Sequence, residues 1–101
     1  MEIEGTYMYG TQAPWGAALL DMKRPGWRAE INLETMLIRK FNLCVLAQLY
    51  GSYEEGLRVL GLLEDFEEVF RHGFSLPSGM GQPWALLQEE WELLIREGLP
   101  G

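Results

Sequence analysis

Glycines divide this chain into short segments, and the segments with helical periodicity end at one of them. A glycine closes a helix readily because it adopts the left-handed backbone conformation without steric cost. The closing glycines are Gly51, Gly61, Gly73 and Gly98, and Pro25-Gly26 ends an earlier segment. Most helices in such a chain must be short. The sequence therefore predicts a mainly α fold, a compact bundle of four to five short helices.

The length and composition suit one domain with one core. The 101 residues are 48% hydrophobic, which is sufficient for a modest buried core. Near the start, Ile3, Tyr7 and Tyr9 occupy odd-numbered positions, a spacing typical of extended chain. We therefore expect residues 1–12 to form an N-terminal arm, either extended or a β-hairpin. Residues 13–101 are expected to form a single helical domain.

The number of cysteines and the length of the apolar runs indicate the cellular compartment. Cys44 is the only cysteine, so no internal disulfide can form, and no stretch reaches the roughly 18 apolar residues of a membrane span. The first 20 residues also lack the basic start and apolar run of a secretory signal. We expect a cytoplasmic protein that does not bind membranes.

Capping residues and apolar spacing predict five helices. Pro14 suits a first helical position, Asn42 is a good N-cap, and Ser52 with Glu55 forms a capping box. The predicted helices span residues 14–23, 43–50, 53–60, 63–72 and 83–97. Residues 27–38 fit a strand and a helix equally well, and residues 74–83 have the composition of a loop.

Three of these helices have an apolar stripe that we expect to be buried. The predicted buried side chains are Trp15, Leu19 and Met22 in the first helix, Leu63, Phe66, Val69 and Phe70 in the fourth, and Trp84, Leu87, Trp91, Leu94 and Ile95 in the last. Burial of these aromatic and aliphatic groups supplies the main driving force for folding.

Residues 46–60 also have the spacing of a DNA-binding helix-turn-helix, with the turn at Gly51. The supposed recognition helix, however, would present Glu54 and Glu55 with Arg58 as its only base, and would meet phosphates with like charge. We therefore interpret the segment as a tight helical hairpin and expect no direct binding of nucleic acid. The hairpin should bury Leu46, Leu49, Leu57 and Leu60.

The formal net charge of −7 comes entirely from the second half of the chain. Residues 1–50 hold five bases and five acids, whereas residues 51–101 hold three bases and ten acids. This one-sided field repels nucleic acid and anionic membranes and favours a partner with a basic surface. The partner-binding residues are predicted to be Glu54, Glu55, Glu64, Asp65, Glu67 and Glu68.

Four short motifs lie within residues 16–62: GAALLD from Gly16, PGW from Pro25, INL from Ile31 and CVLAQLYGSY from Cys44. Together they resemble a family of small uncharacterised proteins from actinobacteria and their phages. The chain departs from that pattern at residues 39–42, where small polar residues are frequent, and at Ala47, where a glycine is usual. The resemblance implies no known reaction. It does imply a phage or mobile-element origin, where short acidic proteins commonly bind host machinery.

Cys44 and His72 are the only thiol and the only imidazole, so a cysteine-dependent enzyme would need both. A place in the first helical turn lowers a thiol pKa, but the apolar neighbours of Cys44 favour a buried, structural cysteine. His72 precedes Gly73, where an imidazole can bind the last carbonyls of a helix. One cysteine and one histidine do not complete a zinc site, and the acids lack the spacing of a calcium loop. We expect no catalytic residue, no metal and no cofactor.

Three functional hypotheses follow. The leading one is a small acidic, non-enzymatic binding module that docks on a basic groove of a host nucleic-acid-handling protein and inhibits or modulates it. The second is a structural or virion-associated homo-oligomer, at least a homodimer, held together by the abundant Trp and Tyr residues. The third and least favoured is an enzyme that uses Cys44.

Overall fold

Five α-helices and one 3₁₀ turn make up the regular structure in the computed structural model, which describes residues 12–76 and 82–97. They are α1 (Ala13–Lys23), η1 (Trp27–Glu30), α2 (Val45–Tyr50), α3 (Tyr53–Leu60), α4 (Phe66–Arg71) and α5 (Gln82–Glu97). No strand occurs in these ranges, so the predicted mainly α bundle is confirmed. The predicted arm or hairpin at residues 1–12 lies outside the described residues except for Gln12, and its separation from a domain at 13–101 stays a prediction.

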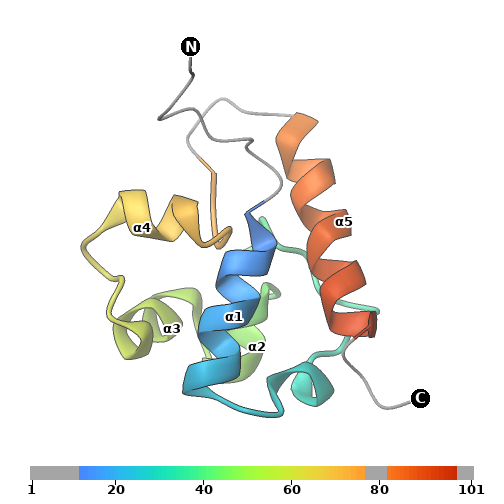
Figure 1. Cartoon of the computed structure of the whole chain (residues 1–101), viewed down its shortest axis with the longest axis horizontal. Coiled ribbons are helices and arrows are strands. Elements are labelled where there is room, and N and C mark those ends of the chain that lie inside the picture. The colour runs from blue at the N-terminus through green and yellow to red at the C-terminus, as the bar shows by residue number, and fades with distance from the viewer. Residues whose placement is uncertain (1–11, 77–81, 98–101) are drawn as a thin grey trace.

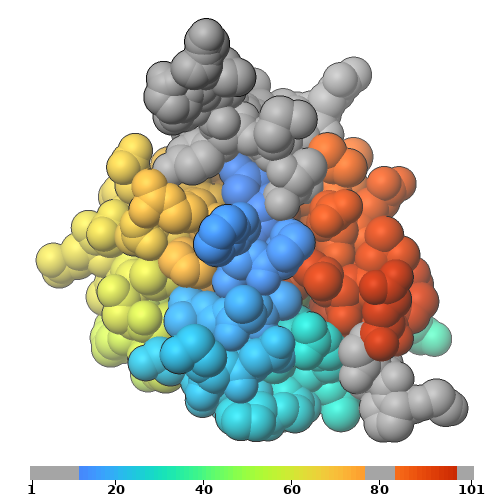
Figure 2. Space-filling model, viewed as in Figure 1, coloured from blue at the N-terminus to red at the C-terminus, as the bar shows by residue number. Residues whose placement is uncertain are grey.

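Helix α1 lies in the middle of the molecule (Figure 1). Helix α5 packs along one side of α1, and α3 and α4 lie toward the other side, with α2 behind. The space-filling view shows the outer surface of α1 as a strip between α5 and the α3–α4 region (Figure 2). None of the helices in the described part of the chain has the length and apolar character of a membrane span.

Helix α1 buries a side made mostly of small residues and exposes two of its large apolar ones. Trp15 is 64% exposed and Met22 is 77% exposed, so their predicted burial was wrong. The buried side is formed by Ala13, Gly16, Ala17 and Leu20. Small side chains let α5 approach closely: a Cβ atom on Gly16 would lie 2.9 Å from ring carbons of Trp91. Close helix packing, and not side-chain hydrophobicity, therefore decides which side of α1 faces inward.

Trp91 on α5 is the centre of the core. Its ring is fully buried, stacks on Phe74 at 5.5 Å between centroids and meets Trp27 edge-on at 5.9 Å. Its Nε1 donates a hydrogen bond of 2.8 Å to the Gly73 carbonyl. The predicted stripe of α5 is confirmed, since Leu87, Trp91 and Ile95 are buried and Trp84 and Leu94 are half-buried against the core.

The helical hairpin predicted for residues 46–60 is confirmed. Leu46, Leu49, Leu57 and Leu60 are all buried where α2 packs on α3. The Ser52 side chain accepts a hydrogen bond of 3.0 Å from the Glu55 amide, which is one half of the predicted capping box, and the Glu55 carboxylate pairs with Arg58. Gly51 and Gly61 end the two helices with positive φ angles.

Helix α2 begins two residues later than predicted. Residues 43 and 44 are held in a turn, because the amides of Leu43 and Cys44 both donate to the Lys40 carbonyl. Cys44 has an extended backbone and stands at the N-cap, so Asn42 does not cap the helix and remains exposed. The prediction that Cys44 lies in the first helical turn was therefore wrong.

Two glutamine side chains hold the irregular segment 31–44 in place. For residues 27–38, which overlap this segment, the sequence fitted a strand and a helix equally well. The Gln48 Oε1 accepts from the Asn32 amide at 2.6 Å. On the opposite side, the Gln88 amide group donates to the Met36 carbonyl and accepts from the Ile38 amide, both at 2.8 Å. These bonds satisfy backbone groups that a helix or sheet would otherwise pair. The segment can thus bury Ile31, Met36 and Ile38 without regular structure.

Helix α4 is shorter than the predicted helix 63–72. It starts at Phe66, and the Asp65 side chain caps it by accepting from the Glu68 amide at 3.2 Å. Only Val69 of the predicted apolar stripe is fully buried, while Phe66 is 67% exposed. The late start explains the difference: Phe66 occupies the first turn, and the core is reached one turn later.

Candidate protein-binding surface

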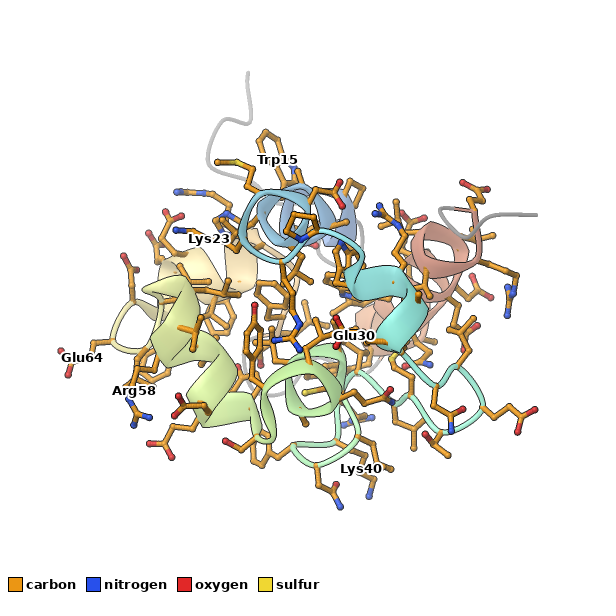
Figure 3. The ribbon with its side chains drawn as sticks, turned by 90° about the horizontal axis from the view of Figure 1, so that it is seen from below. Trp15, Lys23, Glu30, Lys40, Arg58 and Glu64 are labelled. Carbon is orange, nitrogen blue, oxygen red and sulfur yellow. The ribbon has the colours of Figure 1, made fainter. Side chains whose placement is uncertain are left out.

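The six acids predicted to bind a partner lie on two consecutive helices and the link between them. Glu54 and Glu55 are in the first turn of α3, and Glu67 and Glu68 are in the first turn of α4. The others, Glu64 and Asp65, belong to the link. Viewed from below, Glu64 points outward from this link, away from the body of the molecule (Figure 3).

Three of the six acids are used within the protein. Glu55 forms an ion pair with Arg58, and Glu68 forms one with Arg71, each within a single helix. The Asp65 carboxylate caps α4. Intrahelical pairs of this kind are exposed and contribute little to stability, but they lower the local negative charge.

The remaining three acids are available to a partner. Glu54, Glu64 and Glu67 are exposed and form no ion pair with any residue in the described ranges. Two bases of the N-terminal half pair within their own half: Arg24 with Glu30, and Arg28 with Asp21. The excess negative charge of α3, α4 and their link is therefore only partly neutralised.

An apolar groove that the sequence analysis missed lies beside these acids. It has a volume of about 680 Å³ and is lined by Phe41, Ser52, Tyr53, Glu54, Leu57, Leu63, Glu64 and Phe66. The Phe41 ring, 74% exposed, stacks on the ring of Tyr53 at 5.3 Å between centroids. Burial raises the pKa of the Tyr53 phenol, so this ring stays neutral. Aromatic walls with an acidic rim suit an apolar side chain that is accompanied by a base.

Two weak signals of this groove are present in the sequence. Phe41 is an isolated aromatic between Lys40 and Asn42, outside every predicted helix. Phe66 stands among acids, directly after the residue that caps α4. Phe41 belongs to no periodic stripe. Phe66 belongs to the stripe predicted for residues 63–72 but is left exposed by the structure, and exposed aromatics of this kind are the ones that interfaces use.

A second, smaller hollow has the opposite charge. Its volume is about 290 Å³, and its lining is Leu37, Arg39, Lys40, Trp84, Ala85 and Gln88. The Arg39 guanidinium lies 5.2 Å from the centroid of the Trp84 ring, a cation–π contact. Lys40 precedes Phe41 directly, so the basic hollow and the acidic groove are lined by consecutive residues of the chain.

Cys44 and His72 both occupy positions that indicate a structural role. Cys44 is 2% exposed, and burial raises the pKa of its thiol even though amides of α2 act in the other direction. The His72 Nδ1 contacts the Glu68 carbonyl at 2.8 Å at the end of α4, and its ring packs on Phe74. This is the capping role predicted from the sequence. Across residues 12–76 and 82–97, no three His, Cys, Asp or Glu side chains gather in a way that could hold a metal.

Comparison with known proteins found no match to this chain among family models, curated proteins or solved structures. The resemblance to small proteins of actinobacteria and their phages stays a prediction from the sequence. A function for the chain must be inferred from the chemistry of its own surface.

Proposed function

We propose that the protein is a non-enzymatic binding module that docks its acidic surface on a basic groove of a host nucleic-acid-handling protein and so inhibits or modulates it. We define the acidic surface as the six acids of α3, α4 and their link: Glu54, Glu55, Glu64, Asp65, Glu67 and Glu68. The observation that carries the proposal is that three of them, Glu54, Glu64 and Glu67, are exposed and unpaired in the described part of the chain.

The spacing of these carboxylates supports competition with nucleic acid. Side chains three and four residues apart on a helix project about 5–6 Å from one another, which is close to the interval between phosphates along a strand. A protein surface whose Lys and Arg residues bind phosphates would accept such carboxylates as well. The net charge of −7 would also steer the module toward a basic groove.

The proposal is tested by purifying bound proteins from the natural host and then measuring the affinity of the purified partner by calorimetry. Glu67→Lys is expected to weaken the complex at least tenfold, about 1.4 kcal/mol, because an attraction becomes a repulsion. Duplex DNA should compete with the module for the same partner. Glu34→Lys is the matched control, since Glu34 is an exposed acid outside the acidic surface and carries the same charge change. Equal affinities for the wild type and Glu67→Lys would remove α4 from the mechanism.

A structural, homo-oligomeric role is the second candidate, and the groove is the observation that favours it. Exposed aromatic side chains such as Phe41 and Phe66 are enriched where subunits meet. The cysteine-enzyme hypothesis has no comparable support, because burial keeps the Cys44 thiol protonated and away from solvent.

A further inference from the structure

Phe41 and Phe66 present an unusually large apolar area to solvent for two rings in one groove. Phe41 is 74% exposed and Phe66 is 67% exposed, and both line the 680 Å³ groove together with Leu57 and Leu63. Contiguous apolar surface of this kind in a small protein marks an interaction site. The charges around the groove indicate what covers it.

The groove and the smaller hollow carry opposite charges. Glu54 and Glu64 line the groove together with Phe41. Lys40, the chain neighbour of Phe41, lines the smaller hollow together with Arg39. None of Glu54, Glu64 and Lys40 forms an ion pair with a described residue, and Glu64 and Lys40 both point outward, with α3 between them in the view from below (Figure 3).

We propose that a second copy of this chain occupies the groove and forms a two-fold symmetric dimer. A two-fold interface brings the same patch together from both subunits, so the patch must be complementary to itself. The surface around Phe41 meets this condition: the Phe41 ring of each copy enters the groove of the other. Arg39 and Lys40 of each copy then face Glu54 and Glu64 of the other, and each ion pair is formed twice.

The net charge of −7 on each copy opposes this association at long range. At an ionic strength of about 0.15 M, however, charges separated by more than about 8 Å are largely screened, whereas charges in contact across an interface are not. Local complementarity around Phe41 therefore decides the outcome under physiological salt.

The dimer goes beyond the proposed docking function and limits it. Dimerisation covers Glu54 and Glu64, which the acidic surface also uses, so self-association and docking on a foreign protein compete. The two proposals can fail separately. Lys40 belongs only to the dimer surface, and Glu67 belongs only to the acidic surface.

Sedimentation velocity on the full chain, over a dilution series at about 0.15 M salt, tests the dimer. The expected result is a reversible equilibrium between monomer and dimer. Phe41→Ser should raise the dissociation constant at least tenfold, whereas Leu93→Ser, at another exposed apolar position, on α5, should leave it unchanged. A monomer at every concentration, or growth past a dimer without limit, would overturn the proposal.

A charge exchange between two variants tests the geometry more sharply. Lys40→Glu alone and the double variant Glu54→Lys/Glu64→Lys alone should each associate at least tenfold more weakly than the wild type, because like charges then meet. Mixed together they should form a heterodimer, because opposite charges meet again at both copies of the contact. Recovery on mixing also shows that both variants are folded.

The matched control replaces the double variant with Glu34→Lys/Glu67→Lys, which changes the net charge by the same amount outside the groove. That protein should bind Lys40→Glu more weakly than Glu54→Lys/Glu64→Lys does, because one of the two contacts in the mixed dimer still brings like charges together. Equal affinity of Lys40→Glu for the two partners, or no heterodimer with Glu54→Lys/Glu64→Lys, would show that the groove does not receive the basic segment of a second copy.

Discussion

Replacing Gly16 with Ala is expected to destabilise the protein although it improves helix propensity. Gly16 lies in the middle of α1, where alanine is normally about 1 kcal/mol more favourable than glycine. At this position, however, the added Cβ would lie 2.2 Å from the His72 carbonyl oxygen and 2.9 Å from two ring carbons of Trp91. The first neighbour is backbone and the second is the centre of the core, so neither can rotate away.

The size of the effect follows from the shift that the new methyl group requires. A carbon and a carbonyl oxygen approach to about 3.3 Å, so α1 must move roughly 1 Å away from the turn after α4. Overpacking of a tight core costs about 1–3 kcal/mol, and the backbone contact places Gly16→Ala near the upper end. After subtraction of the propensity gain, the net loss is about 2 kcal/mol. For a chain of this size that corresponds to a fall in Tm of about 8–16 °C.

Thermal and urea unfolding of Gly16→Ala, followed by circular dichroism, measure this loss. Ala18→Gly is the matched control, because Ala18 is an exposed residue of the same helix and the change is the reverse one. It should lower Tm by about 4–8 °C through propensity alone. If Gly16→Ala instead raised Tm, α1 could not be packed against Trp91 and the His72 carbonyl as described.

The other predictions concern hydrogen bonds and burial. Trp91→Ala should cost about 3–5 kcal/mol in urea unfolding, because it empties the centre of the core, whereas Trp15→Ala on the surface should stay within about 0.5 kcal/mol; equal costs would contradict the assigned core. Gln88→Leu should cost about 1–3 kcal/mol in the same assay by leaving two backbone groups of residues 36–38 unpaired; no loss would mean that water replaces both bonds. Partial burial acts to raise the pKa of Asp21, but hydrogen bonds from the η1 side chains Trp27 and Arg28 hold this pKa below its ordinary value. The stabilisation from Asp21 is therefore complete above the unfolded-state pKa near 4 and is lost as pH falls through the folded-state value, so Asp21→Asn should be destabilising at pH 7 and neutral at strongly acidic pH.

The sequence predicts those helices whose boundaries are fixed by local chemistry. The Ser52 side chain caps α3 by accepting from the Glu55 amide, and Gly61 ends the helix with a positive φ angle. These interactions connect residues at most a few positions apart, so the sequence contains all the information they need. The stripe of α5 is equally local, because a sixteen-residue helix with large apolar groups on one side has one clear way to face a core.

The errors occur where distant residues decide the structure. The buried side of α1 depends on the close approach of Trp91, seventy-five positions away from Gly16. The spacing of the large apolar residues within 13–23 indicates a different side of the helix. The irregular course of residues 31–44 depends on Gln48 and Gln88, which are ordinary polar positions in the sequence. Tertiary contacts of this kind override local propensity.

The sequence predicts the acids of the candidate site but not its groove, because the groove also depends on contacts between distant residues. Charge is a property of composition, so the acids of residues 54–68 were found from the sequence alone. The groove beside them requires Phe41 to reach Tyr53 from a different part of the chain, and only the fold brings the two rings together. An exposed aromatic is recognisable as a site only when its neighbours in space are known.

The position of Phe41 connects the irregular segment to the proposed interaction surface. The Leu37 amide donates to the Leu43 carbonyl, which closes a loop with Phe41 near its tip. The Gln48 side chain donates to that same Leu43 carbonyl and also binds Asn32, so α2 fixes the base of the loop. A helix through these residues would have spread its side chains around an axis. The loop instead directs one ring to the edge of α3 while its two bases, Arg39 and Lys40, line the smaller hollow. The separation of charge that makes the surface complementary to itself is therefore a consequence of the absence of regular structure in this segment.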